Sequence, residues 1–146
     1  MRSQSPELDS AAAVAALYAA DEAILALGIS LGAIAPGSVE LGFTPGPSMG
    51  NGHGIVHGGY LFLLADTAFA YAMASRGQAG VTVNASIDFL APAHIDTALT
   101  ARATEFHRDA VNGVYDVLIT DMQGRVVAAF RGHGRIAKAQ LARTPA

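Results

Sequence analysis

The sequence contains no cysteine and few charged residues. Without cysteine there are no disulfide bonds, no thiolate metal sites and no cysteine nucleophile. Charged residues make up 14% of the 146 residues, whereas soluble domains average roughly 25%. The 9 Lys and Arg against 12 Asp and Glu give a net charge of -3. This balance argues against nucleic acid as a partner, because phosphate binding needs a basic field.

The sequence also has no charge-free apolar run long enough to cross a membrane. The run 11–27 contains Asp21 and Glu22 and follows acidic residues, unlike a secretory signal. The run 60–74 is shorter than the ~20 residues of a membrane helix, and it contains Asp66. We therefore expect a cytoplasmic protein that does not contact membranes. Because 51% of its residues are hydrophobic, we also expect self-association to cover apolar surface.

The length predicts one domain that spans the whole chain, residues 1–146. Its expected parts are an N-terminal helix over residues 9–27, a core over 28–136 and a loose tail over 137–146. The helix is rich in alanine and leucine, with Asp9 or Ser10 as its cap and Gly28 as its end. An interrupted strand over residues 29–44 should follow, with a turn at Pro36.

The middle of the chain changes abruptly in composition. Residues 45–59 are so rich in glycine that they predict a loop whose backbone can closely approach a ligand. Residues 60–75 predict a helix that ends at Arg76 and Gly77. Its apolar residues lie on every side, which is typical of a helix buried all round.

Alternation with a period of two replaces the helical pattern after residue 80. Further strands are expected over residues 81–89, 97–107, 113–120 and 125–136. The short connections between them favour antiparallel neighbours. In the first of these strands, the alternation places Thr82 and Asn84 together on the polar face. The pattern as a whole predicts an α+β fold in which a curved antiparallel sheet wraps around a central helix.

Asp66 is the only charged residue in the predicted central helix. Burying an ionised carboxylate without partners costs several kcal/mol. Asp66 must therefore face a solvent-filled cleft or be satisfied by other groups. A catalytic carboxylate and a structural carboxylate in a subunit interface both fit this position.

The glycine-rich loop supplies possible partners for that carboxylate. Backbone N–H groups at a helix start can hold a phosphate or stabilise an oxyanion. Gly58 would let a carbonyl oxygen approach, and Asn51 offers an amide donor, although a tight connection without a ligand has the same composition. His53 and His57 are four residues apart, but among glycines they do not match a metal pair on a helix. We expect no metal here and interpret His57 as the anchor of the loop.

Two further groups of polar residues lie on predicted strands. The hydroxyl of Thr82 can orient a water molecule, although threonine is also simply common in strands. Arg131, His133 and Arg135 alternate with other residues on the last strand and form one cationic face. This face suits either a phosphorylated ligand or a solvated surface.

Specific motifs add a family resemblance. The sequences NGHGIVHGG at 51–59 and LADTAFAYA at 64–72 resemble the hotdog-fold thioesterases of the phenylacetic-acid-degradation (PaaI) type. The likeness extends through IDFLAP at 87–92, GVYD at 113–116 and FRG at 130–132. The resemblance implies the hotdog fold and hydrolysis of an acyl-coenzyme A thioester without a metal or prosthetic group. It also implies a homotetramer, built as a dimer of dimers, with active sites at the dimer interface.

The resemblance assigns roles by position. Asp66 matches the catalytic carboxylate, acting as general base or as nucleophile, and Thr82 matches the hydroxyl that helps to place water. Asn51 and the Gly58 amide match the groups that polarise the thioester carbonyl, and they would come from the other subunit. The residues expected to bind the rest of the substrate or coenzyme A are His57, Gly59, Asn84, Arg131, His133 and Arg135.

The expected substrates are phenylacetyl- or hydroxyphenylacetyl-coenzyme A, in an apolar pocket built partly from Tyr60, Leu64 and Phe69. Two other functions stay open at this point. One is a hotdog enoyl-coenzyme A hydratase or dehydratase, and the other is a non-catalytic module that binds acyl-coenzyme A.

Overall fold

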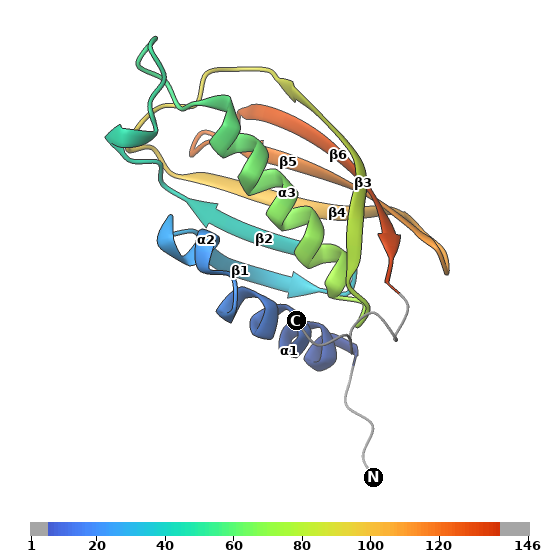
Figure 1. Cartoon of the computed structure of the whole chain (residues 1–146). Coiled ribbons are helices and arrows are strands. Elements are labelled where there is room, and N and C mark those ends of the chain that lie inside the picture. The colour runs from blue at the N-terminus through green and yellow to red at the C-terminus, as the bar shows by residue number, and fades with distance from the viewer. Residues whose placement is uncertain (1–5, 138–146) are drawn as a thin grey trace.

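The computed structural model describes residues 6–137, so the predicted loose tail lies outside the described residues beyond Ala137. A six-stranded sheet curves around one long helix, α3 (Figure 1). The elements in chain order are α1 (Pro6–Ala19), α2 (Glu22–Ala26), β1 (Ser30–Ala35), β2 (Ser38–Phe43), η1 (Pro47–Met49), α3 (Gly58–Ala74), β3 (Gly80–Phe89), β4 (Leu99–Arg108), β5 (Asn112–Thr120) and β6 (Val126–Ile136).

The sheet confirms the predicted α+β architecture. Its strand order is β1-β2-β4-β5-β6-β3, and each neighbouring pair is antiparallel. The turn at Pro36 separates β1 from β2 as predicted, and Gly37 takes a φ of 79° there. β1 and β3 form the two edges of the sheet. β3 therefore keeps unpaired backbone groups along one side within the described chain.

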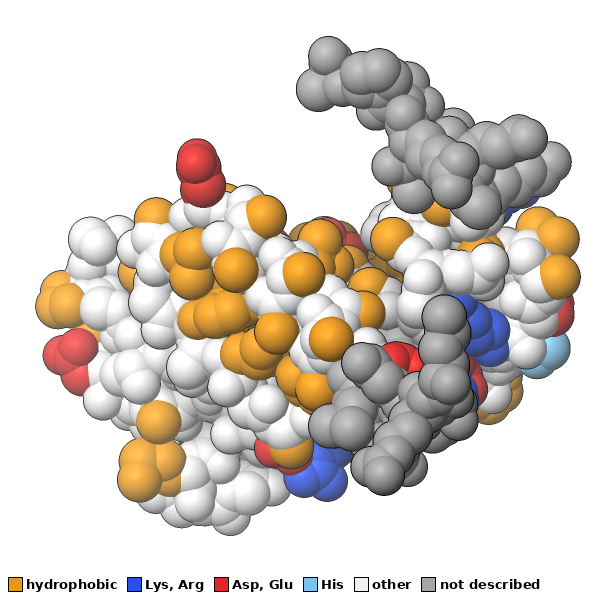
Figure 2. Space-filling view, turned by 90° about the horizontal axis from the view of Figure 1, so that it is seen from below, with side chains coloured by type: hydrophobic (Ala, Val, Ile, Leu, Met, Phe, Trp, Pro, Cys, Tyr) orange, Lys and Arg blue, Asp and Glu red, His pale blue; other side chains and the backbone are white. Residues whose placement is uncertain are grey.

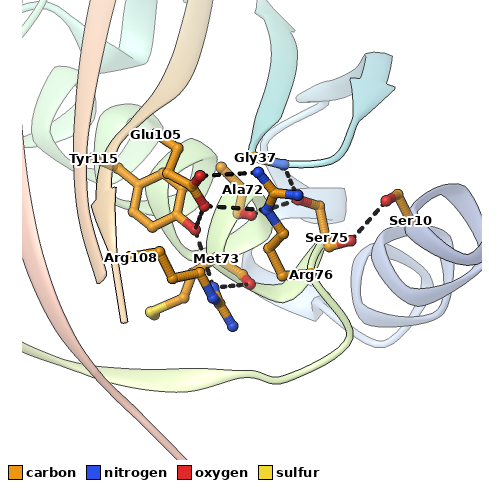
Figure 3. A network of polar contacts seen from close by, with 9 residues as sticks. All are labelled: Ser10, Gly37, Ala72, Met73, Ser75, Arg76, Glu105, Arg108 and Tyr115. Carbon is orange, nitrogen blue, oxygen red and sulfur yellow. Dashed lines mark hydrogen bonds and ion pairs between the residues drawn. The ribbon is translucent and has the colours of Figure 1, made fainter. Parts of the chain in front are cut away.

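The prediction of one continuous helix over residues 9–27 was wrong. The chain forms α1 and α2 with a break before Asp21, whose φ of -91° and ψ of 82° are not helical. Neither Asp9 nor Ser10 is a cap, because α1 begins upstream of both. The Ser10 hydroxyl instead donates to the backbone carbonyl of Ser75 at 2.7 Å (Figure 3). The Ser10 side chain thus makes a tertiary contact, although the local pattern predicted that it would cap the helix.

α3 begins two residues before the predicted start, because His57 caps it. The Nδ1 atom of His57 accepts a hydrogen bond from the Gly59 backbone N–H at 3.2 Å, which confirms the predicted anchoring role. One side of α3 packs on the sheet, where Leu64 and Phe69 are fully buried. The prediction of burial on every side was wrong for the single chain, since Phe62 is exposed although its ring packs edge-on against Phe130 of β6.

Apolar surface therefore remains uncovered on the described chain. Figure 2 shows hydrophobic side chains gathered on the face seen from below, with few charged side chains among them. The exposed large hydrophobic residues include Leu17 of α1, Leu25 of α2 and both Val81 and Phe89 of β3. Within residues 6–137, no helix combines the length and apolar character needed to cross a bilayer. This surface fits the expected self-association.

A network of polar contacts fixes the C-terminal end of α3 (Figure 3). Arg108 of β4 donates to the backbone carbonyl of Met73 at 2.8 Å and to the Tyr115 hydroxyl at 3.0 Å. That hydroxyl donates to Glu105, which pairs with Arg76 at 2.9 Å. The Arg76 guanidinium beside Glu105 holds the pKa of that carboxyl below its usual range. β4 and β5 thereby hold the C-terminal end of α3 in place.

A bulge in β3 overturned the predicted alternation of that strand. The pairing with β6 shifts between Thr82 and Asn84, so Thr82 lies beside Gly134 and Asn84 lies beside His133. Directly paired residues share a face of the sheet. A side chain at Gly134 would touch Met73 of α3, so that position faces the helix. The bulge thus turns Thr82 inward and leaves Asn84 on the outer face, where the sequence had placed them together.

Close packing between α3 and β6 depends on glycine at residue 132. A Cβ atom there would lie 2.8 Å from the buried ring of Phe69. We expect Gly132→Ala to lower the free energy of unfolding by about 1–3 kcal/mol, because a close-packed core cannot admit a methyl group without strain. Urea denaturation at fixed protein concentration measures the effect. Gly46→Ala is the control, since its Cβ would meet nothing within 4 Å. Equal stabilities for the two variants would contradict this account of the packing.

Candidate active site

Asp66 lies halfway along α3, on the side that the sheet does not cover. Its carboxylate borders a pocket of about 270 Å³ between α3 and the α1–α2 region. Partial burial raises the pKa of Asp66 above its ordinary value, and a hydrogen bond from Thr82 offsets part of this rise. A carboxylate whose pKa is raised is a better proton acceptor than an ordinary one. Its place in a pocket makes it a candidate general base.

Thr82 reaches Asp66 because of the bulge in β3. Its hydroxyl donates to Oδ1 of Asp66 at 3.5 Å, a long hydrogen bond. The alternation expected from sequence would have turned this hydroxyl to the outer face of the sheet. The structure therefore brings together two of the four predicted catalytic residues, one from α3 and one from the edge strand.

The loop before α3 holds Asn51 in a fixed orientation. Its Oδ1 accepts hydrogen bonds from the backbone N–H groups of His53 at 2.9 Å and Ile55 at 3.3 Å. With the oxygen bound inside the loop, the NH₂ group is the part of the amide that is oriented to donate outward. The glycine-rich loop thus forms a compact turn, and the same turn positions the Asn51 amide as a donor.

Gly58 stands at the first position of α3, where backbone N–H groups carry the positive end of the helix dipole. A Cβ atom there would lie 3.0 Å from the ring of Phe89, so that ring would have to shift slightly to admit any other residue. Asn51, Gly58 and Phe89 line a second pocket, of about 210 Å³. Two amide donors and a close-approach glycine therefore share one small cavity, as an oxyanion site requires.

The two halves of the predicted site do not meet within one chain. Asp66 follows Gly58 by eight residues, which corresponds to about 12 Å along a helix axis. The pockets that contain them have no lining residue in common. A water molecule activated by Asp66 cannot attack a carbonyl held at Gly58 of the same chain, because the reacting atoms must approach to about 3 Å.

The predicted residues for coenzyme A lie mostly on the outer face of the sheet. Arg131 donates to both carboxylate oxygens of Asp116, at 2.6 and 2.8 Å, and its guanidinium stacks 4.3 Å from the ring centre of Phe106. Nε2 of His133 lies 2.8 Å from Oδ1 of Asn112.

The pairing of β6 with β3 places Asn84 beside His133, and its pairing with β5 places Asn112 beside Arg135. This outer face does not converge with Asp66 in the single chain. The structure places His57 and Gly59 at the start of α3 instead.

Sequence reasoning missed two residues of the Asp66 pocket. Asp21 and Tyr71 line it together with Asp66, and the Tyr71 hydroxyl donates to Oδ2 of Asp21 at 2.8 Å. The available signal was the acidic pair at Asp21 and Glu22, which interrupts an otherwise charge-free apolar run over residues 11–27. Leu64 and Phe69 were wrongly assigned to an acyl pocket, since both are fully buried against the sheet.

Comparison with known proteins identifies the family. The model of the thioesterase superfamily matches residues 53–128. The acyl-coenzyme A thioesterase PaaI of Escherichia coli K12 is 44% identical over 117 residues, which cover 80% of this chain and 84% of that protein. The solved structure of E. coli PaaI, from the phenylacetic acid degradation operon, superimposes with a TM-score of 0.90 at 40% identity, covering 92% of this chain and 97% of the other.

A second solved structure is a hypothetical thioesterase protein from Streptococcus pneumoniae TIGR4 with coenzyme A. It superimposes with a TM-score of 0.73 at 30% identity, and the alignment covers 75% of this chain and 85% of that one. The fold, the family model and the extent of sequence identity agree. The chain therefore belongs to the thioesterase superfamily, and it is a hotdog-fold thioester hydrolase of the PaaI type.

Proposed function

We propose that this enzyme hydrolyses aryl-acetyl thioesters of coenzyme A, such as phenylacetyl- or hydroxyphenylacetyl-coenzyme A, to the free acid and coenzyme A. The observation that carries this is the half-buried Asp66, with Thr82 beside it, bordering a pocket of about 270 Å³. The E. coli relative is an acyl-coenzyme A thioesterase, and the S. pneumoniae relative was solved with coenzyme A. The absence of cysteine suits the cytoplasm, where we place the enzyme.

In the proposed reaction, Asp66 takes a proton from a water molecule that Thr82 helps to orient. The water oxygen bonds to the thioester carbon, and negative charge develops on the carbonyl oxygen. The Gly58 N–H and the Asn51 amide stabilise that charge. The C–S bond then breaks, and coenzyme A leaves as a thiolate, which is a good leaving group because a thiol has a pKa of about 8.5. No metal or prosthetic group takes part.

Two copies of the chain would form each active site, with Asn51 and Gly58 from one and Asp66 and Thr82 from the other. The separation of about 12 Å along α3 supports this, because one chain cannot place both halves on one carbonyl. The exposed apolar residues of the edge strand β3 provide a surface for such pairing. Two such dimers would form the homotetramer.

A panel of thioesters tests the proposed function. Release of free thiol is measured with phenylacetyl-, hydroxyphenylacetyl- and medium-chain acyl-coenzyme A, and hydration of an enoyl-coenzyme A is measured in parallel. We expect hydrolysis that favours the aryl-acetyl substrates and no hydration. Hydration without hydrolysis would establish a hydratase instead, and thioester binding without turnover would overturn the proposed reaction.

The pH dependence follows from the environment of Asp66. A general base must be ionised, so kcat/KM falls as the pH drops through the pKa of Asp66, which burial raises above its ordinary value of 3.8. Thr82→Val removes the hydrogen bond that lowers this pKa, so the acidic limb should move to higher pH. The profile of kcat/KM against pH measures the shift. Thr100→Val, at an exposed position of β4, is the matched control. If the acidic limb of Thr82→Val lies at the same pH as that of the wild type, Thr82 does not influence the pKa of Asp66.

A further inference from the structure

The pocket beside Asp66 has a second polar end. It lies between α3 and the place where α1 gives way to α2, and its lining includes Leu17, Asp21, Leu63, Asp66, Ala70 and Tyr71. Asp66 therefore opens into a cavity that contains another carboxylate. The proposed reaction does not use that second carboxylate, although a carboxylate rarely lines an apolar cavity without a functional or structural role.

The side chain of Asp21 does not make the hydrogen bond that its position in the chain favours. Asp21 stands at the N-cap position of α2, where aspartate normally accepts a hydrogen bond from a backbone N–H of the helix. It makes no such bond. Its carboxylate accepts the Tyr71 hydroxyl at 2.8 Å instead, across 50 residues of sequence. The Asp21 carboxylate is therefore held against α3 and does not cap α2.

Tyr71 holds the carboxylate in a fixed position. It is buried, with an exposed fraction of 1%, and its ring lies edge-on to that of Tyr18 with 6.4 Å between ring centres. The Tyr18 hydroxyl is itself bound to the backbone carbonyl of Ile29 at 2.7 Å. Burial and the neighbouring Asp21 raise the pKa of Tyr71, so its hydroxyl stays protonated and donates. The Asp21 carboxylate is therefore a rigid acceptor.

The Asp21 carboxylate can accept more hydrogen bonds than it receives. Among residues 6–137, the Tyr71 hydroxyl is the donor found on the Asp21 side chain, whereas an ionised carboxylate can accept about four hydrogen bonds. Water meets this need while the pocket is open. An acyl group that displaces the water must supply a donor of its own, because leaving a charged acceptor unpaired is costly.

The size of the pocket suits an acyl group of limited length. Asp66 and Asp21 both line this one pocket of about 270 Å³, which has room for a methylene and one six-membered ring. An acyl group in the pocket, with its thioester carbon beside Asp66, therefore meets Asp21 as the second carboxylate of its surroundings.

We propose that Asp21, positioned by Tyr71, determines which acyl groups this enzyme prefers. On the basis of the proposed function, its carboxylate accepts a hydrogen bond from a donor, such as a hydroxyl, at the far end of the acyl group. It disfavours acyl groups that are apolar at that end, because they desolvate the carboxylate without replacing the lost hydrogen bonds. It disfavours anionic acyl groups through repulsion of like charges.

Matched substrates test this role. The values of kcat/KM are measured for 4-hydroxyphenylacetyl- and phenylacetyl-coenzyme A, with kcat and KM determined separately. We expect the wild type to prefer the hydroxylated substrate. Asp21→Asn presents an NH₂ donor in place of an acceptor oxygen, so the preference should fall about tenfold to a hundredfold, the range for a hydrogen bond to a charged group. Glu22→Gln, which removes an exposed charge at the next residue, is the control and should keep the preference.

Tyr71→Phe gives an independent second variant, because it frees the carboxylate without removing it. We expect a smaller loss of preference, seen mainly in KM for the hydroxylated substrate. A wild type without preference, or an Asp21→Asn variant that slows both substrates equally, would overturn the inference while leaving thioester hydrolysis intact. A wild type that hydrolyses neither thioester would instead refute the proposed function.

Discussion

Replacing Asp66 by alanine should slow thioester hydrolysis by ~10²-fold or more, the usual scale for losing a positioned base. The effect should appear in kcat, because Asp66 acts on the attacking water rather than on substrate binding. Thiol release from phenylacetyl-coenzyme A measures it. Asp66→Asn keeps the shape of the side chain but cannot accept the proton, so it should be similarly slow.

The control for this experiment is Asp9→Asn, which removes an exposed aspartate from α1. Thermal unfolding of each variant shows whether the fold is kept. Because partial burial of an ionised carboxylate is unfavourable, Asp66→Ala should not destabilise the fold. A folded Asp66→Ala enzyme that hydrolyses at the wild-type rate would remove Asp66 from the mechanism.

Mixing two inactive variants should restore activity if each active site is shared between two chains. Asn51→Ala removes a donor to the oxyanion and should slow the reaction by about 10²-fold. A dimer with one Asn51→Ala chain and one Asp66→Ala chain has both defects in one site and none in the other. Such a hybrid should have about half the wild-type activity per dimer, since a two-fold dimer has two equivalent sites.

Hybrids can be purified by placing a different affinity tag on each variant. The matched control pairs Asp66→Ala with Thr82→Val, because both residues belong to the same half of the site. That hybrid regains no intact site, and its activity per dimer should be about half that of the Thr82→Val enzyme, since its other site carries Asp66→Ala. An Asn51→Ala and Asp66→Ala hybrid no faster than its parents would show that one chain builds the whole site, contrary to the 12 Å spacing expected along α3.

Much of the fold follows from local patterns. The strand at 38–43 lies within the interrupted strand predicted over residues 29–44, with Val39, Leu41 and Phe43 buried. The central helix and the antiparallel strands were predictable because hydrophobic periodicity and short connections are local properties. The break at Asp21 was not predictable from the local pattern, because the side chain of Asp21 is bound by Tyr71, 50 residues away, and not by its own helix.

The candidate site divides in the same way. The sequence by itself determined that Asp66 is the one charge on an apolar helix, that a glycine-rich loop precedes that helix, and that both match the PaaI-type motif. Side-chain identity and spacing along one chain are sufficient for those statements. Only the tertiary structure decided that the bulge in β3 turns Thr82 toward Asp66 and that Asp21 shares its pocket. A bulge and a long-range hydrogen bond arise from pairing between distant segments, which a local pattern does not encode.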